Sequence, residues 1–82
     1  MSDETIAFSV AQKTEENIRQ TLTFVYDALR EKGYNPINQI VGYILSADPT
    51  YVTNYKNART IINKIERDDL LKILVKSYLD VR

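Results

Sequence analysis

Two Asx-Pro dipeptides, Asn35-Pro36 and Asp48-Pro49, fix where helices can begin in this chain. Asn and Asp cap the first turn of a helix, and Pro suits the first helical position because its missing N–H would have no partner there. Each dipeptide therefore ends one segment and begins the next. Gly33, just before the first dipeptide, is a typical residue beyond the end of a helix.

Apolar residues recur at spacings of three and four in every segment between these signals. This periodicity predicts an amphipathic helix over 15–32, opened by Thr14, and another from Pro36 to the Asp48-Pro49 signal. It predicts a third from about 50 or 54 to 65, and a last one to about residue 80 that has Asp68 and Asp69 in its first turn. The stripes are Ile18, Leu22, Val25 and Leu29; Ile37, Ile40, Val41 and Ile44; Tyr51, Tyr55, Ala58, Ile62 and Ile65; and Leu70, Leu71, Leu74, Val75 and Tyr78.

Residues 1–13 follow a different pattern, in which Ile6, Phe8 and Val10 alternate with other residues. Period two is a weak strand signal, and a lone strand needs a neighbour. The sequence thus predicts a flexible or weakly β N-terminal arm over 1–13 and a helical domain over 14–82. The expected fold is all-α, a compact bundle of four to five short helices. Gly42 inside one of them predicts a close approach of another helix.

The chain has 82 residues and neither Cys nor His. A domain this small is marginally stable, and disulfides and the common zinc ligands are excluded. We therefore expect a homodimer, in which a second subunit supplies the stability that a domain this small lacks. The six Tyr either serve such an interface or fill a small core.

The composition of the chain also argues against several classes of function and of partner. Without Cys and His, and with only two Gly, the common catalytic triads and glycine-rich phosphate loops are excluded, so we expect no enzyme and no cofactor. Eleven basic residues balance eleven acidic ones, which disfavours nucleic acid and membrane as partners. The acidic start lacks a signal-peptide pattern, so the protein is expected to be cytoplasmic.

Two groups of polar residues are candidate partner-binding sites. Lys56, Arg59 and Arg67 predict either a solvated charged face or a site for a phosphate or an acidic partner. The alternative, a helix-turn-helix DNA-binding regulator, would need a larger basic surplus. The second group lies near the start of the second helix, where the polar residues either cap or bridge to a turn or form a contact surface. Its members are Tyr34, Asn38 and Gln39.

Residues 34–49 read YNPINQIVGYILSADP, preceded by VYDAL at 25–29 and EKG at 31–33. Together with IERD at 65–68 and LVKSYL at 74–79, this closely resembles the IreB/ReoM family of Gram-positive bacteria. The resemblance is dense over 22–79. The chain departs from the family pattern at Ala47 and Thr53, which replace Gly and Pro, and at Asn54 and Asn63, which replace basic residues.

This resemblance implies a dimeric, helical, regulatory phosphoprotein. It implies as partners a membrane Ser/Thr kinase with extracellular PASTA domains and the matching phosphatase. It further implies control of peptidoglycan synthesis and cell-wall antibiotic tolerance, through turnover of the first committed enzyme of that synthesis. The downstream partner would then be a component of a protease complex or the enzyme itself.

The resemblance also implies a phosphorylated Thr near the N-terminus, in an Asp-x-Thr context followed by an apolar residue. Asp3-Glu4-Thr5-Ile6 fits this context, and no other Thr precedes Thr14. Thr5 is therefore the expected phosphorylation site. A phosphate adds about 1.5 to 2 negative charges, which would repel an acidic partner or dock on an arginine.

Overall fold

The computed structural model describes residues 3–81, with side chains from Thr14 onward. Over this range the chain is helical and contains no strand, so the all-α prediction is confirmed. The α-helices are α1 (Asp3–Glu31), α2 (Pro36–Ser46), α3 (Ala58–Ile62) and α4 (Arg67–Leu79). Two 3₁₀ turns, η1 (Pro49–Tyr51) and η2 (Tyr55–Asn57), connect α2 to α3.

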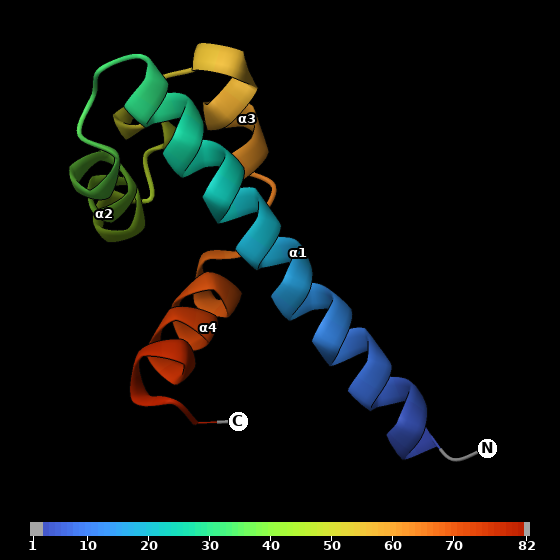
Figure 1. Cartoon of the computed structure of the whole chain (residues 1–82). Helices are drawn as coiled ribbons and strands as arrows, with labels where there is room; N and C mark the ends of the chain where they lie inside the picture. Colours follow the sequence, from blue (N-terminus) through green and yellow to red (C-terminus); the bar gives the residue numbers. More distant parts are fainter. Residues whose placement is uncertain (1–2, 82) are drawn as a thin grey trace.

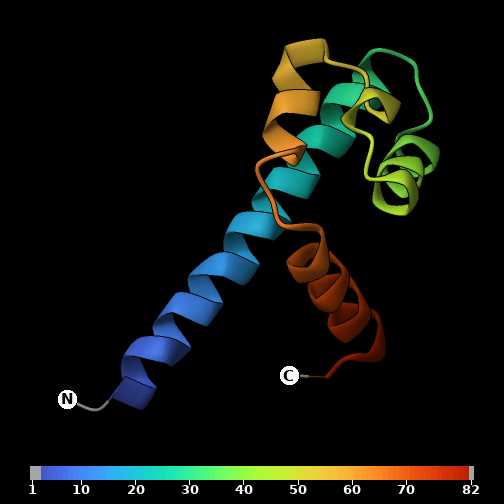
Figure 2. The same cartoon turned by 180° about the vertical axis from the view of Figure 1, so that it is seen from behind.

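The long helix α1 sets the shape of the molecule. Its 29 residues span about 43 Å at 1.5 Å per residue, and the whole measures 47 × 24 × 20 Å. Figures 1 and 2 both show α2 and α3 gathered around the C-terminal half of α1, while the N-terminal half extends beyond them. The helix α4 runs from this body along the same side of α1 but diverges from it (Figure 1).

The prediction for the start of the chain was wrong. The structure has one continuous helix from Asp3, so Thr14 lies inside α1 and does not open it. The expected arm over 1–13, flexible or weakly β, is replaced from residue 3 by helical backbone. A helix satisfies its backbone hydrogen bonds internally, whereas an isolated strand cannot.

Local capping chemistry worked as predicted around α2. The side chain of Asn35 accepts a hydrogen bond from the Asn38 N–H at 3.1 Å, and Pro36 is the first helical residue. Asp48 caps η1 in the same way through Thr50 N–H at 3.0 Å. Gly33 has a φ of +90°, the left-handed conformation that favours glycine after a helix.

The third predicted helix is shorter than expected. Lys56 and Asn57 both have left-handed backbone, with φ of 53° and 65°, and this breaks the segment before α3. The structure therefore has two 3₁₀ turns and only five α-helical residues where the periodicity indicated a helix to 65. The spacing of apolar residues in the sequence does not reveal such a break, because Tyr55, Ala58 and Ile62 still face the body.

The core lies between the C-terminal half of α1, α2 and α3. Val52 and Tyr43 pack there together with side chains of α1 and α3, and the Tyr43 hydroxyl donates to Asn63 Oδ1 at 3.4 Å. Ile18 and Leu70 are buried outside this cluster, one on α1 and one on α4. The core residues are Val25, Ala28, Leu29, Tyr43, Val52, Ala58 and Ile62.

Gly42 makes the close approach that the sequence predicted, but its neighbour is an aromatic ring rather than another helix. A Cβ atom at this position would lie 2.7 Å from Cδ1 of Tyr51. The 3₁₀ turn η1 thus brings the Tyr51 ring close to the glycine face of α2.

Candidate functional site

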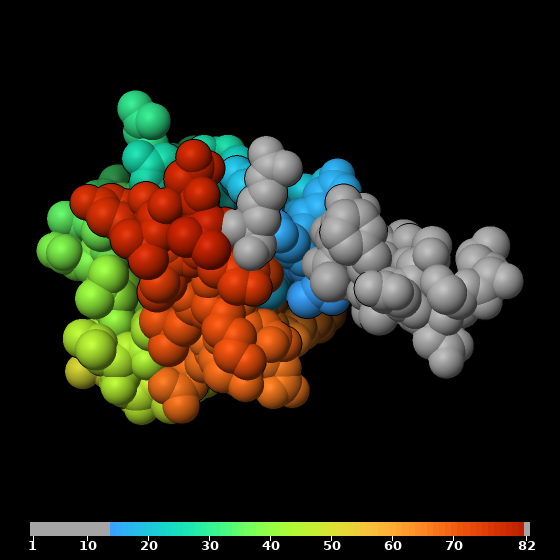
Figure 3. All heavy atoms as spheres, turned by 90° about the horizontal axis from the view of Figure 1, so that it is seen from below, coloured from blue at the N-terminus to red at the C-terminus, as the bar shows by residue number. Residues whose placement is uncertain are grey.

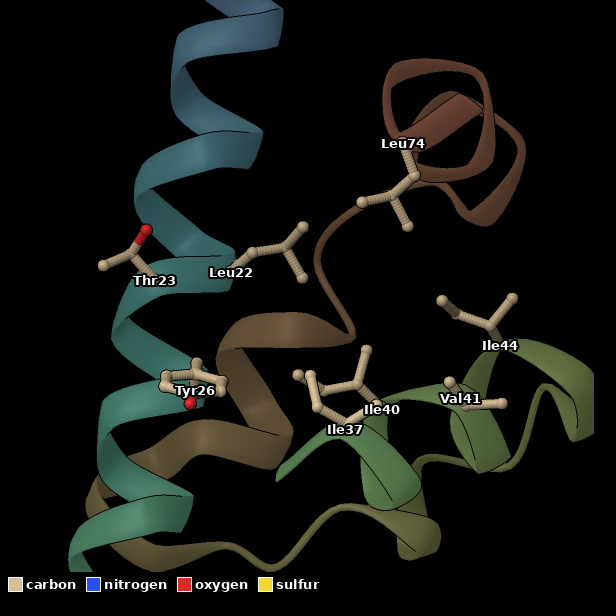
Figure 4. Close-up of a pocket in the computed structure, with 8 residues that line it drawn as sticks. All are labelled: Leu22, Thr23, Tyr26, Ile37, Ile40, Val41, Ile44 and Leu74. Atoms are coloured by element: carbon tan, nitrogen blue, oxygen red, sulfur yellow. The ribbon is translucent and has the colours of Figure 1, made fainter. Parts of the chain in front are cut away.

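An open apolar groove of about 380 Å³ lies between α1, α2 and α4. Figure 4 shows Leu22 of α1, Leu74 of α4 and Ile44 of α2 directed into the same space. The stripe of α2 that the sequence predicted to be buried is therefore only partly covered, and Ile37 and Val41 remain 58% and 46% exposed. The groove is lined by Leu22, Thr23, Tyr26, Ile37, Ile40, Val41, Ile44 and Leu74.

A second hollow continues this groove along α1 and α4. It shares Leu22, Thr23 and Leu74 with the groove and extends to Ile18 and Arg19. Seen from below, α4 lies at the centre of this face, with α2 on one side and α1 on the other (Figure 3). The apolar surface between these three helices is thus continuous.

The helix α4 is apolar on two sides. Leu70, Ile73 and Leu74 face the body or the hollows, while a second stripe faces outward and is exposed, up to 90% for Tyr78. A helix that is apolar on two sides is normally covered on both. We call the second stripe the outer stripe of α4; it consists of Leu71, Val75, Tyr78 and Leu79.

The three basic residues of the predicted site bond to different parts of the chain. Lys56 Nζ lies 2.7 Å from Glu31 Oε2, and the Tyr55 hydroxyl donates to Glu31 Oε1 at 3.0 Å. These hydrogen bonds hold the pKa of Glu31 below its usual value, the Lys56 bond contributing most. The pKa of Lys56 is raised in turn by its bond to Glu31. This cluster fastens η2 to the end of α1.

The two arginines also bond to backbone. Arg59 Nε donates to the Val52 carbonyl at 2.9 Å, and Arg67 Nη1 donates to the Ile44 carbonyl at 2.8 Å. Ile44 lies in the last turn of α2, where carbonyls have no partner within the helix. Arg67 therefore ties the start of α4 to the end of α2. Arg59 is thus bonded to the chain itself, on a helix α3 that is only five residues long.

The polar residues near the start of α2 have separate places. Gln39 Oε1 accepts from the Thr53 N–H at 2.9 Å, so it bridges α2 to the following loop. The backbone N–H of Asn38 serves the Asn35 cap, and the Asn38 side chain is exposed. Tyr34 is exposed in the turn after α1. The structure thus leaves Tyr34 and Asn38 exposed and bonds the Gln39 amide oxygen within the chain.

Within residues 3–81 no helix combines the length and the hydrophobicity that crossing a membrane requires. Among residues 14–81, whose side chains are described, no cluster of carboxylates could bind a metal ion. No buried side-chain nitrogen or oxygen among the described residues lacks a hydrogen-bond partner. The feature of this region that stands out chemically is its exposed apolar surface.

Comparison with known proteins decides the family. The sequence profile described as IreB regulatory phosphoprotein matches residues 3–80. This chain belongs to the IreB family. It is also 56% identical over 78 residues to a "UPF0297 protein" of Ruminiclostridium cellulolyticum, a match that covers 95% of this chain and 89% of that protein. The resemblance inferred from the sequence is thereby confirmed, and the IreB family is one of regulatory phosphoproteins rather than of enzymes.

The IreB match includes Thr5, the expected phosphorylation site. The backbone of Thr5 lies in the first turn of α1, and its side chain is outside the described residues. The phosphorylation assignment stays a prediction.

Sequence reasoning missed the groove because it treated each apolar stripe as buried. Two signals pointed to it. Leu70, Leu71, Leu74 and Val75 cover too wide an arc for one face of α4, and α2 carries more large apolar residues than so short a helix can bury.

Proposed function

We propose that this chain is a non-enzymatic regulatory phosphoprotein that acts by binding other proteins, under control of phosphorylation at Thr5. The observation that carries the proposal is the exposed apolar surface of α2 and α4 on a chain of the IreB family. Large exposed apolar surfaces on small domains are typical of protein–protein contacts. The proposed kinase is the membrane Ser/Thr kinase with PASTA domains, and the matching phosphatase reverses the modification.

The proposed process is peptidoglycan synthesis and, through it, cell-wall antibiotic tolerance. The unphosphorylated chain promotes turnover of the first committed enzyme of that synthesis, and phosphorylation relieves the effect. The support is the dense sequence resemblance over 22–79. The downstream partner is a component of the protease complex or the enzyme itself.

The fold bears on how a phosphate at Thr5 would act. A phosphate in the first turn of a helix is stabilised by the helix dipole, so modification favours α1 and does not melt it. Thr5 is twenty residues before Val25, which packs in the core beside α3, and twenty helical residues span about 30 Å. We therefore propose that the phosphate is recognised by a partner and not by Arg59 of the same chain.

Phosphate mapping tests this proposal. The full chain is treated with the kinase domain and ATP, and phosphate is located by mass spectrometry in wild type, Thr5→Ala and Thr14→Ala. Thr14 is the matched control, because it is the next Thr along α1. We expect Thr5→Ala to lose the phosphate and Thr14→Ala to keep it. If Thr5→Ala takes up as much phosphate as wild type, the assignment is wrong.

We also propose that the chain is a homodimer through the outer stripe of α4. Tyr78 and Leu79 are the most exposed members of this stripe, 90% and 62%. An apolar stripe on a single helix can pair with its own copy about a two-fold axis. Sedimentation should detect a dimer of wild type and of Leu45→Ser, and a monomer of Tyr78→Ser. A stable wild-type monomer at micromolar concentration would contradict the proposal.

A further inference from the structure

The helix α4 is anchored to the rest of the chain at its N-terminal end. Leu70 is its one buried residue, and Arg67 donates to the Ile44 carbonyl at 2.8 Å. From Leu74 to the end of the helix every residue is exposed, with 37% for Leu74 and 90% for Tyr78. A segment opens at little cost in free energy where few of its apolar side chains are buried. The last two turns of α4 can therefore change their position while the first turn stays in place.

The connection between α3 and α4 allows such a movement. Residues 63–66 are not helical, and Glu66 has extended backbone with a ψ of 127°. The Ile65 N–H donates to the Ile62 carbonyl at 3.2 Å, so the preceding turn belongs to α3. The Glu66 side chain makes no capping hydrogen bond to α4. The angle at which α4 leaves the body is thus not fixed by a cap, and the buried Leu70 is the point about which it can turn.

The inner face of α4 lies across an open apolar space from the other two helices. Figure 4 shows Leu74 directed toward Leu22 of α1 and Ile44 of α2, with the groove between them. Ile73 and Ser77 lie on the same face of α4 and line the second hollow. A movement of α4 toward α1 would remove this apolar surface from water, which is favourable in free energy.

Ser77 opposes complete closure. The inner face of α4 recurs at spacings of three and four, and its first positions carry the apolar residues Leu70, Ile73 and Leu74. The next position carries Ser77, whose hydroxyl would lose its contact with water on closure. The apolar residues favour a closed position and this hydroxyl disfavours it, so the two positions of α4 differ little in free energy.

We propose that α4 is a lid that turns about its anchored first turn and closes over the groove between α1 and α2. In the closed position Leu74 packs against Leu22 and Ile44. In the open position, which the structure shows, the groove is accessible to a partner protein. The outer stripe of α4 stays exposed in both positions. The proposal does not involve Thr5, so its test and the phosphate mapping can fail independently.

Distances between two spin labels test the movement directly. The chain has no Cys, so Gln20→Cys on α1 and Lys76→Cys on α4, both at exposed positions, give two labels without background. The labelled full chain is diluted into unlabelled chain, so that pulsed EPR measures distances within one chain. Lys76 lies six residues, or about 9 Å of helix, beyond Leu70, so a turn of roughly 30° moves it by about 5 Å. We expect two distance populations for this pair and one for a Gln20–Asn38 pair, which omits α4.

Matched variants assign the two populations. Leu74→Ser removes the closing contact and should lower the ratio of the shorter to the longer distance about fivefold. Ser77→Leu completes the apolar inner face and should raise this ratio about fivefold. Leu45→Ser, the same change on α2 at a residue that is 81% exposed and outside the groove, should leave it unchanged.

Two results would overturn the proposal. One is a single distance population for the Gln20–Lys76 pair in wild type and in Ser77→Leu. The other is a ratio that Leu74→Ser and Leu45→Ser change equally. Circular dichroism melts check that each variant is folded, and Ser77→Leu keeps the test decisive if Leu74→Ser is not.

Discussion

Replacing Gly42 by Ala should destabilise the protein even though Ala is the better helix former. In a helix interior the change is worth about 1 kcal/mol in favour of Ala. The new Cβ, however, would lie 2.7 Å from Cδ1 of Tyr51 and 3.2 and 3.3 Å from two other ring carbons. The ring must therefore move away from α2.

The size of the effect follows from these two opposing contributions. Forcing a methyl group into a packed contact costs about 1 to 3 kcal/mol. Tyr51 is 53% exposed, so its ring can turn outward and the cost should fall near the middle of that range, about 2 kcal/mol. The net loss expected for Gly42→Ala is about 1 kcal/mol, or about 4 to 8 °C in the melting temperature of a domain this small.

A double-mutant cycle separates the two contributions. In a Tyr51→Ala background the steric contact is absent, so Gly42→Ala should stabilise by about 1 kcal/mol. In Tyr51→Phe, which keeps the ring and loses only the hydroxyl, Gly42→Ala should remain destabilising. Urea unfolding followed by circular dichroism measures all six proteins. If Gly42→Ala changes the free energy of unfolding equally in all three backgrounds, the contact with Tyr51 is not the reason that Gly42 is needed.

Three further perturbations address the contacts that hold the body together. Gln39→Ala leaves the Thr53 N–H without its side-chain partner and should lower the free energy of unfolding by about 1 kcal/mol in urea titrations; an unchanged value would mean that water replaces the bond. Arg67→Ala should loosen α4 from α2, giving faster hydrogen exchange in α4 than in α1, whereas uniform exchange would contradict the tie. The pKa of Glu31 is held below its usual 4.5 mainly by the hydrogen bond from Lys56. The ionised Glu31 carboxylate therefore contributes fully to the stability of the fold above pH 4.5, and this contribution is lost as the pH falls through the lowered pKa. Glu31→Gln should therefore flatten the acid side of the melting-temperature profile, and an unaltered slope would exclude this role.

Local chemistry made part of this fold predictable. The cap at Asn35 and the proline after it define the start of α2 without reference to any other residue. The acidic first turn of α4, with Asp68 and Asp69, was equally readable. Such signals act within one helical turn and do not depend on distant contacts, so the structure confirms them.

Features that depend on distant contacts were not predictable in this way. Gln39 was recognised as a candidate bridge, but its partner at Thr53 lies fourteen residues away. The left-handed backbone of Lys56 and Asn57 leaves no signal in the spacing of the apolar residues. Predicting the groove would have required the knowledge that α4 diverges from α1 and leaves Leu74 opposite Leu22. For each of these, the arrangement of elements decided the outcome.

The central claim is that the chain controls an early enzyme of peptidoglycan synthesis according to the state of Thr5. Quantitative immunoblotting of the first committed enzyme tests it in cells that carry wild type, Thr5→Ala, Thr5→Glu or a deletion of this protein. We predict a lowered enzyme level with Thr5→Ala, which cannot be phosphorylated, and a raised level with Thr5→Glu that approaches the deletion. Equal enzyme levels in all four strains would contradict the proposed function.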